Sequence, residues 1–247
     1  MNTPVVNQPV EIPSLHDAES QRLAARMTEL ARAMAECEGI DRFAETGWLP
    51  DSFFTTMAEL YKLYDAYIAH NLATSELKIV CKFGCTRCCH QAVHGMFAFE
   101  AIALYRRLRP LPDYAATHAA LADYAGSFEA TLEQIADADD GDPAEPMQRT
   151  LEAFAAAAAP CPLLAGSHCS VYTQRPFACR SYHSLTDPLF CTTAQGRTFN
   201  IDVPAAAAEI LWSLSDRLAY PFPTLLAQGL VTLAERRQSL PWVAPVA

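Results

Sequence analysis

The chain has 247 residues, of which 51% are apolar and 19% are charged. This composition is typical of a globular protein with a hydrophobic core and excludes a disordered one. The formal net charge of −10 argues against a basic surface for nucleic acid. No apolar run approaches the roughly 18 residues that span a bilayer, and the first 14 residues do not resemble a signal peptide. We therefore expect a cytoplasmic protein with neither a membrane nor a nucleic acid as partner.

Helical periodicity accounts for most of the chain. A helix that Ser14 or Asp17 would cap extends to about residue 35, before a stop at Gly39. Residues 92–99 are either a strand or an extended lead-in, and the acidic segment 137–146 is a solvated loop broken by Gly and Pro. Further helices are predicted at about 51–71, 100–108, 113–136, through the alanine run to 159, 203–218 and 224–238.

The sequence predicts a mainly α fold in which cysteine-rich loops converge on a metal centre. No βα alternation, dinucleotide motif or phosphate loop is present. We expect one domain made of three parts: an N-terminal helical region (1–77), a metal-binding core (78–192) with a helical insertion (100–159), and C-terminal helices (193–247).

Nine cysteines are the unusual feature of this chain. In a reducing compartment they are not expected to form disulfides, and an odd number cannot all pair within one chain. Cys37 lies far from the other cysteines in the sequence, and Cys191 follows the last of them. The remaining seven form a first block, Cys81, Cys85, Cys88 and Cys89, and a second block, Cys161, Cys169 and Cys179.

Both cysteine blocks lie in segments without a single acidic residue, 78–99 and 153–186. If the 28 acidic residues were spread evenly, these segments would hold about six of them. They contain five basic residues instead. Carboxylates raise the pKa of nearby thiols and cations lower it, so the two segments are matched to one shared anionic centre. The alternative is that acidic residues are absent because these segments form apolar helix faces or parts of the core.

The spacing within the first block would bring its thiols together whether the backbone forms a helix or a turn. In a helix, Cys81, Cys85 and Cys88 would share one face, whereas a turn at Gly84 would converge the same thiols. Adjacent Cys88 and Cys89 point in different directions in both cases. We therefore expect these two to serve different metals or opposite sides of one cluster.

Two arginines accompany the second block. Arg175 and Arg180 can donate hydrogen bonds to sulfur or to a bound anion, which makes them candidate cofactor-binding residues. Alternatively, they pair with remote carboxylates. His90, His94, His168 and His183 also lie next to cysteines, either as ligands or as hydrogen-bonding neighbours.

The second block carries a family resemblance. It reads CPLL from Cys161 and then CSVYTQRPFACRSY from Cys169, and it resembles the YkgJ-type cysteine cluster family, the CxxCxxCC zinc- or iron-chelating domain. The resemblance covers about residues 78–192, and the first block departs from the family pattern by one extra residue between Cys81 and Cys85. It implies that the metal or iron–sulfur ligands are Cys81, Cys85, Cys88, Cys89, Cys161, Cys169, Cys179 and Cys191.

The identity of the metal is open between zinc and iron–sulfur, because thiolates suit both. The family includes flagellin lysine-N-methylase, so the resemblance places an enzyme within range. Such an enzyme would carry out redox chemistry at an iron–sulfur centre, or would modify a protein or peptide with S-adenosylmethionine. The spacing C-x3-C-x2-C also resembles the radical S-adenosylmethionine signature, but Arg87 stands where that signature usually has an aromatic residue. The alternative function is a non-catalytic zinc module with a structural or metal-handling role.

Overall fold

A computed structural model describes residues 16–82, 84–137, 145–191, 197–218 and 225–237. Helices dominate these residues, so the predicted mainly α fold is confirmed. The α-helices are α1 (Ala18–Ala35), α2 (Phe43–Thr46), α3 (Asp51–Thr74), α4 (Ala98–Leu108), α5 (Tyr114–Asp137), α6 (Glu145–Ala157), α7 (Phe177–Ser181), α8 (Ala205–Arg217) and α9 (Leu226–Arg237). The 3-10 turns are η2 (Ile40–Arg42), η3 (Arg87–His90), η4 (Tyr172–Gln174) and η5 (Pro188–Phe190).

The four strands are very short and form two antiparallel pairs. Strand β1 (Leu164–Ala165) pairs with β2 (His168–Cys169), and β3 (Tyr182–Ser184) pairs with β4 (Thr198–Asn200). The sequence does not predict these strands, because two or three residues are too few to show an alternating pattern.

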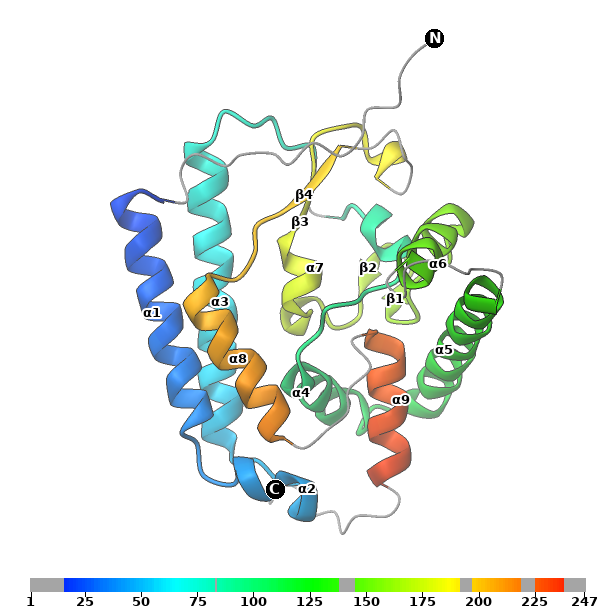
Figure 1. The fold of residues 1–247 in the computed structure, drawn as a ribbon, viewed down its shortest axis with the longest axis horizontal. Coiled ribbons are helices and arrows are strands. Elements are labelled where there is room, and N and C mark those ends of the chain that lie inside the picture. Colours follow the sequence, from blue (N-terminus) through cyan, green and yellow to red (C-terminus); the bar gives the residue numbers. More distant parts are fainter. Residues whose placement is uncertain (1–15, 83, 138–144, 192–196, 219–224, 238–247) are drawn as a thin grey trace.

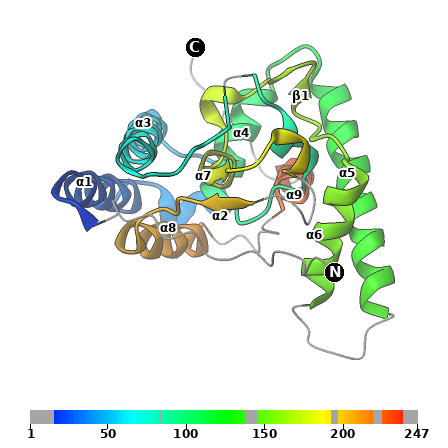
Figure 2. The same ribbon diagram turned by 90° about the horizontal axis from the view of Figure 1, so that it is seen from above.

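The long helices form two groups with the cysteine-bearing loops between them. Helices α1, α3 and α8 pack together on one side, and α5, α6 and α9 on the other, as Figure 1 shows. Helix α4 contacts both α8 and α9 and so connects the groups. The view from above in Figure 2 shows the same division, with α7 between the two groups. The cysteine-rich segments are therefore held from two sides by helices.

The residues at the two ends of helix α1 determine where this helix begins and ends. The Asp17 carboxylate accepts a hydrogen bond from the Ser20 N–H (2.7 Å) and caps the helix as predicted; Ser14 lies outside the described residues. The buried Ser20 hydroxyl donates to the Asn71 side-chain oxygen of α3 (2.9 Å). Gly39 has a φ of +90°, which a residue with a Cβ rarely adopts, so the chain turns away there after the helix ends.

Most predicted helix boundaries are confirmed within a few residues. Helix α4 begins at Ala98, and residues 92–97 are an extended lead-in without strand pairing. Asp51 is the first residue of α3 rather than its cap, because Pro50 occupies the cap position. Helix α6 ends at Ala157, two residues before the predicted end. Of the predicted acidic loop, residues 138–144 lie outside the described part of the chain.

One continuous apolar core connects the three predicted parts. It contains residues from four helices that are 0–2% exposed: Met27 of α1, Phe53 and Tyr64 of α3, Phe99 of α4 and Leu230 of α9. Apolar burial of this extent is the main stabilising contribution to folding. Within the described ranges, no helix has both the length and the apolar composition that crossing a membrane requires.

Candidate metal centre

The first cysteine block is anchored to strand β3. The Val80 N–H donates to the Ser184 carbonyl (3.1 Å), and the Ser184 N–H donates to the Cys81 Sγ (3.2 Å). A turn follows, in which the Cys85 N–H donates to the Lys82 carbonyl (3.0 Å) and Gly84 has a φ of +83°. Of the two predicted backbones for Cys81 and Cys85, the structure therefore shows the turn and not the helix.

A backbone hydrogen bond joins the two cysteine blocks. The Cys161 N–H donates to the Cys89 carbonyl oxygen at 2.7 Å. Cys89 and its neighbour Cys88 lie in the 3-10 turn η3. Their side chains are hydrogen-bonded to each other, which is the largest cause of the strongly raised pKa of the Cys88 thiol. The two thiols therefore lie close to each other in this turn, and the expectation that they serve different metals or opposite sides of one cluster stays a prediction.

The β1–β2 hairpin places two cysteines of the second block close together. Leu164 stands opposite Cys169 in the strand register, and the Leu164 N–H donates to the Cys161 carbonyl (2.9 Å). Gly166 makes the turn with a φ of +60°. Burial raises the pKa of the Cys161 thiol to about 11.

Cys179 is carried by the short helix α7, which an aromatic cage holds in place. The ring of Phe177 meets the rings of Tyr61, Tyr64 and Phe97 edge to face, with centroids 4.9, 5.0 and 5.9 Å away. Because Cys179 follows Phe177 by two residues, this cage fixes its position. Burial raises the pKa of the Cys179 thiol well above its ordinary value.

A buried carboxylate also supports α7. Glu100 is 0% exposed, and its carboxyl accepts hydrogen bonds from the Tyr61 hydroxyl (2.8 Å), the Phe177 N–H (2.8 Å) and the Phe97 N–H (3.0 Å). Burial nevertheless raises the pKa of this carboxyl to about 7. Sequence reasoning missed this role. The available signal was an acidic residue directly after an acid-free segment and inside an apolar run.

Arg180 is a structural residue of the second block. It is 4% exposed, and it donates to the carbonyls of Arg175 (2.8 Å) and Thr173 (2.7 Å) and to the Asp65 carboxylate of α3 (2.5 Å). Its guanidinium also lies 4.3 Å from the centre of the Tyr61 ring. Of the two predicted roles, pairing with a remote carboxylate is the arrangement found; nothing tests the role in cofactor binding.

Arg175, in contrast, is near enough to two of the thiols for its charge to affect them. Its Nε is buried without a hydrogen-bond partner, and its guanidinium lies 4.4 Å from the centre of the Tyr172 ring. The positive charge of Arg175 favours the charged forms of Cys88 and Cys169 and so acts to lower their pKa values. Both pKa values are nevertheless raised, mainly by the hydrogen bond from Cys89 for Cys88 and by burial for Cys169. This residue therefore keeps a donor available for sulfur or an anion.

The histidines next to the blocks are placed differently from one another. The Nδ1 of His90 is hydrogen-bonded to the Thr86 carbonyl (3.0 Å), and the Nδ1 of buried His183 to the Ser181 carbonyl (2.7 Å). His94 and His168 are exposed. In both bonded rings Nε2 is the nitrogen left for another partner.

Cys161 also lines a small pocket together with Gln91, Tyr124, Pro162 and Leu225. The Tyr124 hydroxyl is buried without a hydrogen-bond partner. The Gln91 amide donates to the Tyr182 hydroxyl (3.0 Å) and to the Cys191 carbonyl (3.2 Å). Gln91 thus connects the surroundings of Cys161 to those of Cys191, a link that the sequence did not reveal.

The thiols are neighbours, but they do not surround a common point. Among the described residues, no group of three or more His, Cys, Asp or Glu side chains is arranged so that it could hold a metal ion. The chemistry of the donor set, many thiols with few carboxylates, nevertheless suits soft metals. Binding an ion would require the sulfurs to move closer together.

Comparison with known proteins yields no match: no family model, no curated protein and no solved structure is significantly similar to this chain. The resemblance to the YkgJ-type family therefore rests on the residues of the two cysteine blocks alone.

Proposed function

We propose that this protein binds metal through thiolates of both cysteine blocks. The observation that carries the proposal is the hydrogen bond between the Cys161 N–H and the Cys89 carbonyl, which brings two sequence-distant blocks into contact. Electrostatic coupling between thiols of the two blocks supports it, because a charged Cys88 raises the pKa of Cys161 and of Cys179. The proposed ligands are Cys81, Cys85, Cys88, Cys89, Cys161, Cys169, Cys179 and Cys191.

The raised pKa values explain why a cation would be needed to charge this cluster. Burial raises the pKa of Cys161 to about 11, so this thiol is protonated at neutral pH without a metal. A bound cation stabilises the thiolates and displaces their protons. Metal affinity should therefore fall as the pH is lowered, and binding should release protons.

The resemblance to the YkgJ-type family supports either zinc or an iron–sulfur cluster at this centre. An iron–sulfur centre would provide redox chemistry, or modification of a protein or peptide with S-adenosylmethionine. The four strands of the described residues form two separate pairs rather than the β/α barrel expected of radical S-adenosylmethionine enzymes. A zinc centre would instead act as a structural or metal-handling module.

We also propose a cytoplasmic location, with no nucleic acid as partner. All nine cysteines are free thiols in the structure, which fits a reducing compartment. The net charge of −10 opposes binding to phosphate backbones.

The test is metal and sulfide analysis of the full chain purified without oxygen. We expect stoichiometric zinc, or iron with acid-labile sulfide, and a lower melting temperature after chelation, because bound metal stabilises the folded state. A brown, oxygen-sensitive protein would identify the iron–sulfur version and a colourless one the zinc version. A folded chain that retains neither metal, even after reconstitution with each, would contradict the proposal.

A further inference from the structure

Three segments that are distant in the sequence meet beside strand β3. The Val80 N–H donates to the Ser184 carbonyl of β3 (3.1 Å). The Gln91 amide, directly after η3, donates to the Cys191 carbonyl (3.2 Å), which directly follows η5. The Tyr182 hydroxyl of β3 donates to the same carbonyl (2.8 Å). Strand β3 therefore holds the start of the first cysteine block, η3 and η5 beside one another.

Four exposed basic side chains belong to this region. One of them, Arg197, is joined to it by its carbonyl, which accepts a hydrogen bond from the Leu185 N–H (2.9 Å) directly after β3. The four exposed side chains are Lys78, Lys82, Arg87 and Arg197. Across the described ranges of the chain, no carboxylate forms an ion pair with any of these four.

The acidic residues of the same segments do not cancel this positive charge. Segments 76–91, 182–191 and 197–200 contain two acidic residues, Glu76 and Asp187. One oxygen of the Asp187 carboxylate accepts a hydrogen bond from the Leu189 N–H (2.9 Å). The chain as a whole has 28 acidic and 18 basic residues, so this region has the opposite balance of charge. Exposed cations of this kind attract and orient anionic partners.

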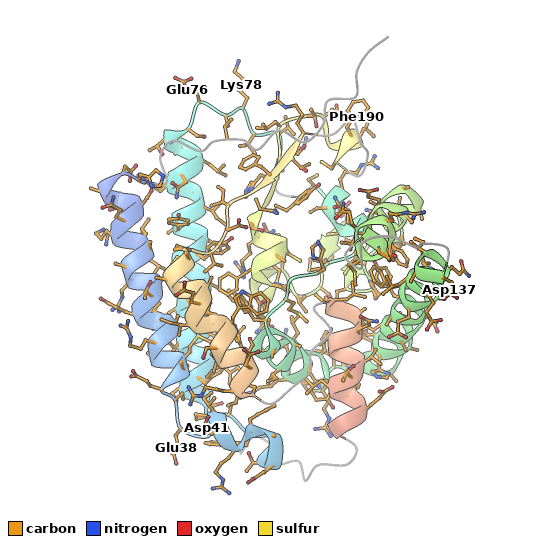
Figure 3. The ribbon with its side chains drawn as sticks, in the orientation of Figure 1. Glu38, Asp41, Glu76, Lys78, Asp137 and Phe190 are labelled. Atoms are coloured by element: carbon orange, nitrogen blue, oxygen red, sulfur yellow. The ribbon has the colours of Figure 1, made fainter. Side chains whose placement is uncertain are left out.

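Two large apolar side chains are exposed in the same region. Leu189 is 59% exposed and Phe190 is 41% exposed, and they are consecutive residues of η5. Figure 3 shows Phe190 at the same end of the protein as Lys78, opposite Glu38 and Asp41. Exposed apolar side chains with a polar rim are typical of surfaces that bind other proteins. An inorganic anion would use the cations of this region but not its apolar side chains.

We propose that this region docks an acidic segment of another protein that also carries a large apolar side chain. The docking surface is formed by Lys78, Lys82, Arg87, Leu189, Phe190 and Arg197. Carboxylates of the partner pair with the four cations, and its apolar side chain covers the apolar pair of η5. The inference goes beyond metal binding and does not require it. It places the partner next to the exposed thiol of Cys81.

The distribution of charge favours a short acidic segment over a nucleic acid or a membrane. A phosphate backbone and an anionic bilayer both present negative charge over an extended surface. Either would face the acidic remainder of this protein as well as the docking surface, because the net charge of the chain is −10. A short segment places its few carboxylates on the docking surface alone.

The probe for the test is a fluorescein-labelled peptide in which Glu and Asp residues flank a single Phe. A matched peptide carries Gln and Asn in their place. Binding to the full chain is measured by fluorescence anisotropy under reducing, anaerobic conditions, at low and at physiological salt. We expect the acidic peptide to bind and the neutral peptide not to bind. Binding should weaken several-fold at the higher salt, because salt screens pairs of exposed charges.

Two substitutions separate the contribution of charge from that of apolar contact. Arg87→Glu should weaken peptide binding by about five-fold or more and reduce its salt dependence. Leu189→Ala should weaken binding by about two- to five-fold without changing the salt dependence, because apolar contact is not screened. Arg42→Glu is the matched control. It makes the same change of charge at an exposed residue that directly follows Asp41, at the opposite end of the protein, and it should change neither quantity.

The inference is overturned if the acidic peptide does not bind, if the neutral peptide binds equally well, or if Arg87→Glu and Arg42→Glu weaken binding equally. Tighter binding of a single-stranded RNA or of phosphatidylserine vesicles than of the acidic peptide would also overturn it, because the surface would then serve another class of partner. These measurements do not depend on metal content, so metal and sulfide analysis tests the proposed function separately.

Discussion

Replacing Glu100 with glutamine tests whether this buried carboxyl carries a proton in the folded protein. Burial raises its pKa from an ordinary 4.5 to about 7, although three hydrogen bonds favour the charged form. A shift of this size corresponds to about 3 kcal/mol in the free energy of unfolding. The folded state therefore binds the proton more tightly than the unfolded state does.

The sign of the pH dependence follows from this difference in pKa. The Glu100 contribution to stability is largest below pH 4.5, falls as the pH rises toward about 7, and is constant above that. A glutamine is neutral at every pH. Its amide cannot accept hydrogen bonds at both ends, so either the Phe97 N–H or the Phe177 N–H loses its acceptor, at a cost of about 1–3 kcal/mol.

Glu100→Gln should therefore be less stable than the wild type at pH 5 and as stable or more stable at pH 7.5. Urea unfolding followed by circular dichroism gives the free energies of both chains across this range, with the same metal content in each. Glu209→Gln, which changes an exposed residue of α8, is the matched control and should show a constant difference. If the difference between Glu100→Gln and the wild type does not change with pH, the buried carboxyl has an ordinary pKa and the reasoning fails.

Three further substitutions test the packing around the second block and between the long helices. Phe177→Ala should lower the free energy of unfolding by about 3–5 kcal/mol in urea titrations, because it empties the aromatic cage; a loss below about 1 kcal/mol would show that the cage does not hold α7. Arg180→Met should cost on the order of 3 kcal/mol, since two backbone carbonyls and Asp65 lose their donor, and unchanged thermal unfolding would refute this role. Ser20→Ala removes the hydrogen bond from this hydroxyl to the buried Asn71 oxygen and should cost about 0.5–1.5 kcal/mol, whereas exposed Ser213→Ala should leave the melting temperature unchanged.

Helices whose signals are local could be predicted from the sequence. The Asp17 cap and the apolar spacing that follows it lie within one segment, and α1 forms as expected. The strands β1 to β4 could not be predicted, because each depends on its partner rather than on a pattern of its own. The turn at Gly84 was one of two alternatives, and its positive φ is visible only in the structure.

The cysteine blocks could be recognised from composition, but their supports could not. Glu100 stabilises α7 through Tyr61, 39 positions earlier, and Phe177, 77 positions later. No local pattern encodes contacts over such separations. The same holds for Ser184, which contacts Cys81 across 103 positions. The sequence thus points to the cysteines as candidate ligands, whereas the structure identifies the residues that hold the cysteine-bearing segments.

X-ray absorption at the metal edge of the anaerobically purified protein tests most directly whether cysteines supply the whole coordination shell. We predict a first shell dominated by sulfur, at about 2.3 Å if the metal is zinc, and the loss of part of that signal in Cys88→Ser and in Cys161→Ser. A shell of nitrogen and oxygen atoms, or a signal that neither substitution changes, would contradict a centre built from both blocks.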